Sequence, residues 1–270
     1  MSLWKRSALR DKVAIVAGAS GGIGAPTARA LVAEGMRVVL AAPDDPLLDA
    51  LARELAIHGD RVLRVPTDIT RRDDIARLVA ATLAAYGKID AIVNVAGIGS
   101  TPSFVDSDDA ELKRVLAINL LGPARLIHAA LPTMIAQRSG AIVNIGSVAG
   151  EAAIMGIYSG SKFGLRGLTD SLRRELRQYK IGVTLIEPGF VATSMNGSLR
   201  NLPPPEIVAN AIVAAIRRPR RKHIVPAFYR PAVFLVKLLP GFVDLVVGHP
   251  RIQARLNRDA RASRDESQAS

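Results

Sequence analysis

The sequence predicts an α/β fold, a doubly wound parallel sheet of about seven strands with helices on both faces. Short, continuously apolar stretches alternate along the chain with longer segments of helical periodicity. Strands of this kind belong to parallel sheets that are covered by helices on both faces. Apolar residues make up 49% of the 270 residues, which is enough to fill the core of one large domain.

Seven stretches have the short length, apolar character and β-branched residues of buried strands. In chain order they are residues 12–17, 37–42, 61–65, 90–95, 140–145, 181–186 and 223–225. Apolar residues recur at helical spacing between them. The expected helices cover residues 28–33, 47–56, 74–86, 108–121 with a continuation toward Ile135, and 206–216.

A glycine-rich turn, residues 18–24, lies between the first strand and the helix that follows it. Glycines let the backbone approach a ligand, and the N–H groups at a helix N-terminus attract phosphate. Asp68, Asn94, Ser147 and Pro188 come at the ends of other strands. Ligands of open α/β sheets bind outside the carboxyl ends of the strands, so we expect the turn and these residues to form one site.

Tyr158 and Lys162 are four positions apart, which places them on one face if the segment is helical. A free tyrosine is a poor base near pH 7, but a neighbouring cation lowers its pKa. The pair is therefore expected to move a proton to or from a substrate hydroxyl. The same spacing is common in ordinary helices, so this interpretation depends on the rest of the chain.

The composition excludes several classes of site. The chain has no cysteine, which excludes disulfides, thiolate zinc sites and a cysteine nucleophile, and we expect no metal site. Residues 1–10 are polar and basic, unlike a signal peptide, and no stretch offers about 20 uncharged apolar residues for a membrane span. We therefore expect a cytoplasmic protein.

The positive charge is concentrated near the end of the chain. The net charge of the protein is +12. Residues 217–270 hold 12 basic and 4 acidic residues, whereas residues 1–216 hold 24 basic and 20 acidic residues. A basic field over the whole molecule is therefore not expected, and neither is nucleic-acid binding, whose signature would be a steep salt dependence.

Several motifs in this order resemble those of the short-chain dehydrogenase/reductase family, over roughly residues 10–228. Gly18-x-x-x-Gly22-Ile23-Gly24 resembles its cofactor-binding glycine motif, and Asn94-Val95-Ala96-Gly97 resembles its N-N-A-G motif with Val95 in place of the second Asn. The resemblance implies a Rossmann-like fold, NAD or NADP as the cofactor, and a small-molecule alcohol or carbonyl substrate. It also implies a homodimer or homotetramer.

The resemblance further implies roles for single residues. Asn119, Ser147, Tyr158 and Lys162 match the catalytic tetrad. Tyr158 would act as general acid or base, Lys162 would lower its pKa, and Ser147 would polarise the substrate oxygen. Asn119 would kink its helix and hold a water that relays protons to Lys162. The residues implied to bind the cofactor are Gly18, Ser20, Gly22, Ile23, Gly24, Asp68, Ile69, Asn94, Ala96, Gly97, Tyr158, Lys162, Pro188, Gly189, Val191 and Thr193.

Ser147 and Tyr158 are eleven positions apart, a residue or two closer than the family pattern. Residues 150–157 between them line the substrate side in that family, so we expect an altered substrate pocket there.

The choice of cofactor depends on the end of the second strand. An acidic residue there bonds the ribose 2′-hydroxyl of NAD, and the matching position is Ala42. A basic residue one place later, or within the glycine turn, would favour NADP, but those two positions are Pro43 and Gly21. Asp44 and Asp45 follow immediately, so NAD is the expected preference.

The chain is expected to divide into a dinucleotide-binding and catalytic domain, residues 1–230, and a C-terminal extension, residues 231–270. Residues 193–205 form a short, proline-rich connection where the family places its substrate lid, which favours an open pocket.

The basic run 217–222 is either a solvated turn or part of a membrane-contacting surface. Residues 231–248 are apolar but interrupted, and three interpretations remain: a flap over the pocket, an oligomer contact, or an interfacial anchor. Residues 251–270 carry a helical stripe of arginines and an end expected to be disordered.

Two functions follow from these observations. The first is an NAD(P)-dependent oxidoreductase that transfers a hydride between nicotinamide and a secondary alcohol or ketone, with a lipophilic substrate if the tail contacts membranes through residues 217–264. The second is a catalytically weak cofactor-binding adaptor that uses the basic tail to bind a membrane or a partner.

Overall fold

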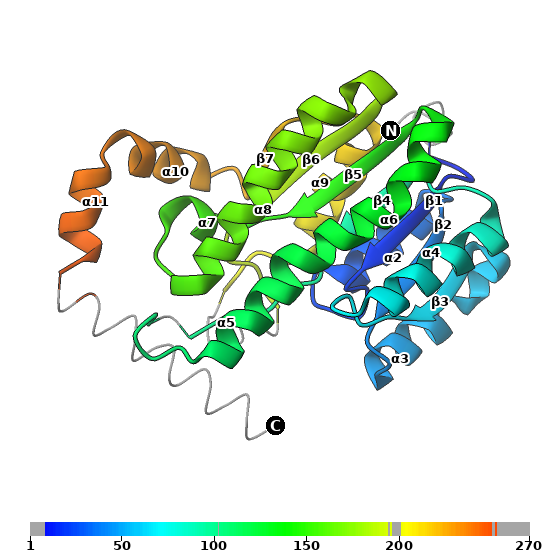
Figure 1. Ribbon diagram of the computed structural model, residues 1–270, viewed down its shortest axis with the longest axis horizontal. Coiled ribbons are helices and arrows are strands. Elements are labelled where there is room, and N and C mark those ends of the chain that lie inside the picture. The colour runs from blue at the N-terminus through cyan, green and yellow to red at the C-terminus, as the bar shows by residue number, and fades with distance from the viewer. Residues whose placement is uncertain (1–8, 102, 194, 196–200, 250–251, 253–270) are drawn as a thin grey trace.

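A computed structural model describes residues 9–101, 103–193, 195, 201–249 and 252, and a parallel sheet forms its centre (Figure 1). Within these residues the sheet has seven strands in the order β3-β2-β1-β4-β5-β6-β7. Their bounds are β1 Val13–Ala17, β2 Arg37–Ala42, β3 Val62–Pro66, β4 Ala91–Asn94, β5 Gly140–Ile145, β6 Ile181–Pro188 and β7 Lys222–Val225. The predicted fold class is confirmed, and the predicted strands lie within one or two residues of their observed bounds.

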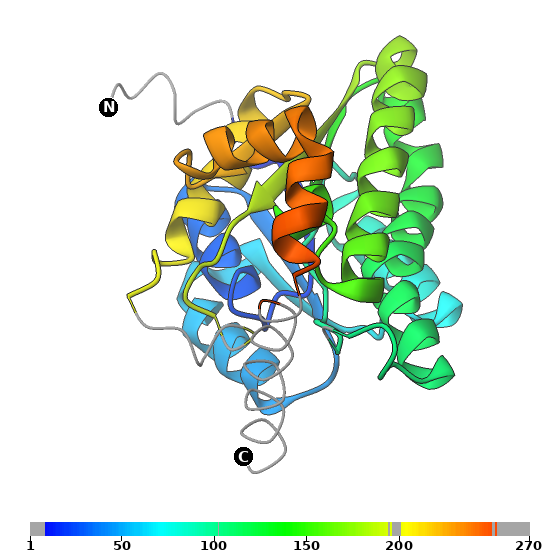
Figure 2. The ribbon, with the colours of Figure 1, turned by 90° about the vertical axis from the view of Figure 1, so that its left-hand side faces the viewer.

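Helices cover both faces of the sheet (Figures 1 and 2). Helices α2 (Gly24–Ala33), α3 (Pro46–Leu55) and α9 (Glu206–Arg217) contribute to one buried core, which they share with alternate strand residues such as Val16 and Val38. Helices α4 (Arg72–Tyr86), α6 (Gly122–Gln137) and α8 (Gly156–Glu175) contribute to the other, which contains Ile15 and Val39. The strands therefore bury both faces, which explains their continuous apolar sequence.

Local sequence signals set the ends of several helices. Asp45 precedes α3, and its side chain accepts a hydrogen bond from the backbone N–H of Leu48 at 2.7 Å, while Pro46 stands at the first turn. Gly87 ends α4 in the left-handed conformation with φ 69°. The turns Ala56–Arg61 and Leu176–Tyr179 are 3₁₀ helices that lead into β3 and β6.

The long helical segment before β5 contains a π turn. Helix α5 (Asp109–Leu116) continues through the π turn Ala117–Leu121 into α6. This combined helix, Asp109–Gln137, is 29 residues long and apolar enough to span a membrane by length and composition alone. In the fold it packs against the sheet, where Leu126, Ile127 and Ala130 are buried.

The basic run 217–222 is more structured than a solvated turn. Arg217 pairs with Glu34 of the segment after α2, and Arg221 makes two hydrogen bonds of 3.0 and 2.9 Å to the carboxylate of Asp170. Lys222 belongs to a buried ion cluster. Three of its five cations therefore bind carboxylates within the fold, which leaves less of this charge for a membrane surface.

The region after β7 forms two short helices, α10 (Tyr229–Leu238) and α11 (Pro240–Val247). Helix α10 lies beside α7 (Ala149–Ala152), and α11 packs on α10 and extends further from the sheet (Figure 1). Val233 is buried, but most large apolar residues of α10 and α11 are exposed. Almost all of the predicted arginine stripe, residues 251–270, lies outside the described residues.

Candidate active site

The glycine-rich turn after β1 is packed so tightly that glycine is required at two positions. Gly18 has φ 88°, and a Cβ there would lie 2.5 Å from the backbone nitrogen of Ala96. A Cβ on Gly24 would lie 1.9 Å from the carbonyl oxygen of Gly18. The turn therefore holds the first strand, the segment after β4 and the start of α2 together.

The exposed face of the same turn offers backbone donors. The N–H groups of Ser20, Gly22 and Ile23 donate to no other described residue, and they stand where α2 begins. A Cβ on Gly22 would lie 2.8 Å from the side chain of Thr193, so the turn also touches the segment after β6. Unpaired N–H groups at a helix N-terminus suit a phosphate, and the turn fits the pyrophosphate of a dinucleotide.

Two acidic residues after β2 are already engaged in the fold. Asp45 caps α3 and also accepts a hydrogen bond of 3.3 Å from the hydroxyl of Ser20. Asp44 pairs with Arg64 of β3. The Ser20–Asp45 contact brings one acidic residue next to the glycine turn.

Ser147 and Tyr158 meet at the carboxyl edge of the sheet. The Ser147 hydroxyl accepts a hydrogen bond of 3.1 Å from the Ala149 N–H, and it lies near enough to Tyr158 to lower the pKa of the phenol. Tyr158 lies in the first turn of α8 with 7% of its surface exposed. Residues 150–157, expected as a loop, include most of the short helix α7 (Ala149–Ala152). The hydroxyl of Ser159 on α8 donates to the carbonyl of Ala149 at 2.9 Å, which connects the two helices.

Lys162 is one turn further along α8 and is buried. Its ammonium donates to the carbonyl of Ile145 at 2.9 Å and lies 5.8 Å from the centroid of the Tyr158 ring. Burial lowers the pKa of Lys162 to about 8. The expected common face of the two side chains is therefore observed.

The expected lowering of the tyrosine pKa is wrong for this structure. Burial raises the pKa of Tyr158 above its usual value, and the hydrogen bond from Ser147 opposes that rise only in part. The physical reason is that removing a phenolate from water costs more free energy than one neutral donor restores. Lys162 is not among the groups that lower it, because its ammonium is directed to Ile145.

Asn119 occupies the π turn between α5 and α6, so the expected break in its helix is present. Its side-chain oxygen accepts from the Ile98 N–H at 2.8 Å, and its amide donates to the Ile98 carbonyl at 2.9 Å and to Ser161 at 3.0 Å. A Cβ on Gly97 would lie 3.1 Å from the Lys162 ammonium and 3.4 Å from the Asn119 side-chain oxygen. Asn119 thus fixes the Asn94–Gly97 motif beside Lys162.

Other predicted residues serve the framework in this structure. Asn94 is 1% exposed and donates to Asn144 at 2.8 Å, inside the sheet. Asp68 accepts hydrogen bonds from the backbone and hydroxyl of Thr70 at 2.8 and 2.7 Å. Ile69 is 8% exposed and packs so closely against the chain after the π turn that a Cβ on Gly122 would lie 2.8 Å from it.

The segment after β6 is held against the Ser147 region and the C-terminal helices. The carbonyl of Pro188 accepts from the Val148 N–H at 3.0 Å, and Gly189 donates to Val225 at 2.8 Å. A Cβ on Gly189 would lie 2.0 Å from the ring of Tyr229. Val191, two residues further, is buried at 2% exposure.

A buried ion cluster behind Ser147 was missed by sequence reasoning. Glu151 of α7 accepts ion pairs from Arg166 at 2.8 Å, Lys222 at 2.6 Å and Lys237 at 2.5 Å, and Lys222 also reaches Glu187 at 2.9 Å. The cluster joins α7, α8, β6, β7 and α10. Its members lie far apart in the sequence and have no motif, so only the topology identifies them.

The two carboxyl groups of the cluster differ in pKa. Burial and the neighbouring Glu151 raise the pKa of Glu187 to about 7. Burial opposes the charge on Glu151 too, but hydrogen bonds from Glu187, Lys222 and Lys237 lower its pKa to about 2. One proton held by Glu187 is therefore part of the cluster near neutral pH.

Comparison with known proteins agrees with this arrangement. The sequence profile of the family described as short chain dehydrogenase matches residues 12–203. An uncharacterized oxidoreductase of Staphylococcus saprophyticus is 33% identical over 230 residues, which cover 83% of this chain and 98% of that protein. The uncharacterized oxidoreductase YxnA of Bacillus subtilis is 31% identical over 257 residues, covering 89% of this chain and 72% of YxnA. A crystal structure of a short chain dehydrogenase/reductase from Burkholderia phymatum in complex with NAD superposes with a TM-score of 0.80 at 28% identity, covering 87% of this chain and 95% of that one.

Proposed function

The chain belongs to the short-chain dehydrogenase/reductase family of oxidoreductases, and we propose that it interconverts a secondary alcohol and a ketone with NAD or NADP. The observation that carries the proposal is the buried pair of Tyr158 and Lys162, whose ammonium lies 5.8 Å from the tyrosine ring, with Ser147 near the phenol. A bound nicotinamide would supply or accept the hydride in this reaction.

Ser147 and Tyr158 would act on the substrate oxygen from one side. The backbone of Ala149 donates to the Ser147 oxygen, which leaves the serine proton free to point to Tyr158 or to a substrate carbonyl. The phenol of Tyr158 would donate its proton when a carbonyl is reduced and take one when an alcohol is oxidised. Its raised pKa favours the phenol form, which is the acid needed for reduction.

Lys162 and Asn119 would prepare the tyrosine for oxidation. The ammonium of Lys162 lies close enough that turning it from Ile145 toward the phenol would stabilise the phenolate. Asn119 holds Ile98 and Ser161 in place around it, and it would carry the proton path to Lys162 that the family resemblance implies. The glycine turn and residues 188–193 would hold the two ends of the cofactor.

A substrate screen tests this function. Secondary alcohols, ketones, steroids, retinoids and acyl carbonyls would be offered with each cofactor, and nicotinamide absorbance followed. Turnover of at least one compound is expected, and Ser147→Ala should lower it by about 10²-fold because one donor to the reacting oxygen is lost. A protein that turns over none of these classes, or a Ser147→Ala variant with full activity, would contradict the proposal.

We further propose that NAD is preferred over NADP. The support is the acidic pair after β2, in which Asp45 bonds Ser20 of the glycine turn, together with the absence of a basic residue at Ala42 and Pro43. The related Burkholderia phymatum protein was crystallised with NAD. Comparing kcat/KM for the two cofactors on one substrate decides the matter, and a clear preference for NADP would reject it.

A second candidate function is a membrane-bound adaptor, and the exposed apolar residues of α10 and α11 favour it. Phe234, Leu238, Phe242 and Leu245 are 66%, 61%, 56% and 73% exposed. Residues 217–264 would contact anionic lipid, either to recruit a lipophilic substrate or to serve binding alone. Triple substitution of Phe234, Phe242 and Leu245 by Ser should abolish co-sedimentation with anionic vesicles. This variant keeps Lys237 in the ion cluster, whereas truncating the chain before α10 would remove it. Unchanged sedimentation of the variant would exclude membrane contact.

We propose two further properties from family membership and sequence. The protein assembles as a homodimer or homotetramer, and residues 1–230 form the catalytic domain, with residues 231–270 as an extension. Light scattering of the full chain tests the assembly, since a monomeric mass at micromolar concentration would reject it. Limited proteolysis tests the boundary, because cleavage first inside residues 1–230 would contradict it.

A further inference from the structure

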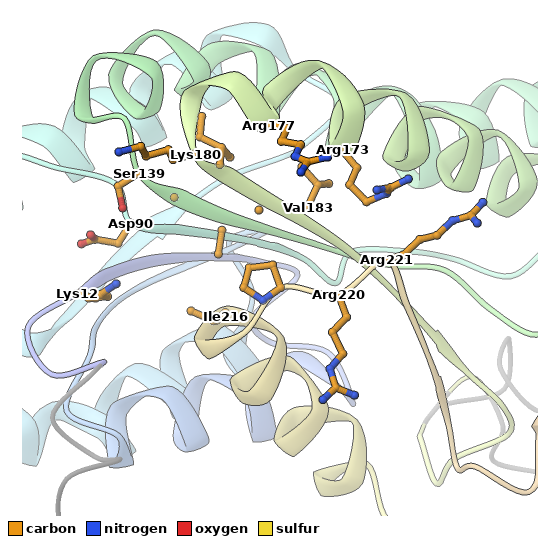
Figure 3. A pocket seen from close by; sticks show the side chains of 15 residues that line it. Lys12, Asp90, Ser139, Arg173, Arg177, Lys180, Val183, Ile216, Arg220 and Arg221 are labelled. Atoms are coloured by element: carbon orange, nitrogen blue, oxygen red, sulfur yellow. The ribbon is translucent and has the colours of Figure 1, made fainter.

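A cavity of about 460 Å³ lies at the edge of the sheet opposite the glycine turn, where strands β5 and β6 begin (Figure 3). Gly140, Ala141, Ile181, Gly182 and Val183 form its floor. Charged residues border it on α8 and the turn after it, in the loop before β7, and in the segments before β1 and β4; the side chains of Arg220 and Arg221 extend to opposite sides (Figure 3). The charged residues are Lys12, Asp90, Arg173, Arg177, Lys180, Arg220 and Arg221.

The charge around this cavity is unbalanced. Its carboxylate, Asp90, already accepts from the Val13 N–H at 2.8 Å and from Lys88 at 3.1 Å. Of the six cations, Arg173 and Arg221 share Asp170, which stands outside the cavity. Among the described residues, no carboxylate lies in ion-pair distance of the other four: Lys12, Arg177, Lys180 and Arg220.

We propose that this cavity binds a small anion carrying two or more phosphate groups. Its volume lies in the range of small-molecule sites. Four of its six cations are arginines, whose planar guanidinium groups bind phosphate oxygens in pairs. A single carboxylate or phosphate would balance at most about half of the four unpaired cations, whereas a diphosphate or triphosphate would match their charge.

The alternative is that these cations bind no ligand and only interact favourably with the dipoles at the C-termini of nearby helices. Helix α8 with its 3₁₀ turn and helix α9 both end at this edge, and cations near helix C-termini are favourable. That account explains single cations near each helix end, but it does not explain why cations from three separate segments, one of them the segment before β1, line one cavity. A ligand that bridges these segments does explain it.

The site is separate from the proposed cofactor site, so the two can be tested independently. The probe is inorganic triphosphate, titrated calorimetrically at constant ionic strength, with and without NAD. The pocket variant is Arg177→Gln with Arg220→Gln. The matched control is Arg174→Gln with Arg218→Gln, which removes the same charge from exposed neighbours that do not line the cavity.

Wild-type protein and the control should bind triphosphate, and the pocket variant should bind at least about tenfold more weakly because two charge-assisted contacts are lost. Triphosphate should also raise the Tm of the wild type by several °C, and by less in the pocket variant. No binding by the wild type, or equal weakening in both variants, would overturn the proposal. So would pocket-dependent binding of duplex DNA without binding of triphosphate.

Discussion

Tyr158 and Lys162 are adjacent, buried side chains whose pKa values burial shifts in opposite directions. Burial favours the neutral form of each, which is the phenol for the tyrosine and the free amine for the lysine. A charged lysine at this place therefore weakens the folded state. This is the stability cost expected where a side chain is kept for chemistry rather than packing.

Lys162→Met is predicted to stabilise the protein. The folded pKa of Lys162, about 8, is below its ordinary 10.5, so the folded state loses this proton first and wild-type stability should rise between pH 8 and 10.5. Removing the amine should increase the free energy of unfolding at pH 7 by roughly 1–3 kcal/mol. The variant should also lack the rise in the free energy of unfolding between pH 8 and 10.5, and it should lose activity. Urea unfolding at several pH values measures both effects.

Lys222→Met is the matched control for that experiment. Lys222 is also partly buried, but its bonds to Glu151 and Glu187 outweigh burial and raise its pKa. Its removal leaves Glu187 without its cation and Glu151 with only Arg166 and Lys237, and it should destabilise the fold by about 2 kcal/mol or more. If both substitutions change stability in the same direction, the burial argument for Lys162 is wrong.

At the scale of elements, the ion cluster connects the Ser147 region to the C-terminal helices. Glu151 lies on α7, four positions after Ser147, and Lys237 reaches it from α10. Glu187 immediately precedes Pro188, whose carbonyl binds Val148. The cluster thus supports the positions of both Ser147 and the segment proposed to hold the nicotinamide.

The cluster predicts a pH dependence of stability. The folded pKa of Glu187, about 7, is above its ordinary 4.5, so the folded state keeps a proton that the unfolded chain loses. The stability contributed by this group is complete below pH 4.5 and is lost as pH rises toward 7. Glu187→Gln mimics the protonated form and should remove this slope, whereas Glu175→Gln, an exposed control on α8, should keep it. Chemical unfolding at half-unit pH steps provides the measurement, and an unchanged slope in Glu187→Gln would refute the assignment.

A glycine contact links α10 to the segment after β6. A Cβ on Gly189 would enter the ring of Tyr229, whereas a Cβ on Gly167 of α8 meets nothing within 4 Å. Gly189→Ala should displace Tyr229 and lower the free energy of unfolding by about 1–3 kcal/mol. Gly167→Ala should raise it by about 0.5–1 kcal/mol through helix propensity. Hydrogen exchange in α10 should increase in the first variant only; full protection there would show that α10 does not depend on this contact.

At the scale of the whole molecule, the parts that the sequence predicts are those with local signals. The central strands are visible because they are apolar on both faces, and the glycine turn is visible because it follows the first strand. The gathering of Ser147, Tyr158, Lys162 and Asn119 follows once the sheet is parallel.

Other features depend on the packed structure. The pKa of Tyr158 follows burial, which the spacing to Lys162 does not encode. The Glu151–Glu187 pair joins residues from two segments, and the ion pairs of Arg217, Arg221 and Lys222 turn a basic run into structural contacts. Helices α10 and α11 have apolar residues in an interrupted pattern, so their exposed faces become visible only in three dimensions.

The central claim, that Tyr158 moves the proton of the reaction, is tested by turnover of Tyr158→Phe against Tyr179→Phe. Both lose one phenol oxygen, but Tyr179 lies in the 3₁₀ turn at the far end of α8. Nicotinamide fluorescence should report cofactor binding by both variants. Tyr158→Phe should lose about 10²-fold or more of kcat, and Tyr179→Phe should keep the wild-type value. Wild-type turnover by Tyr158→Phe would contradict the account.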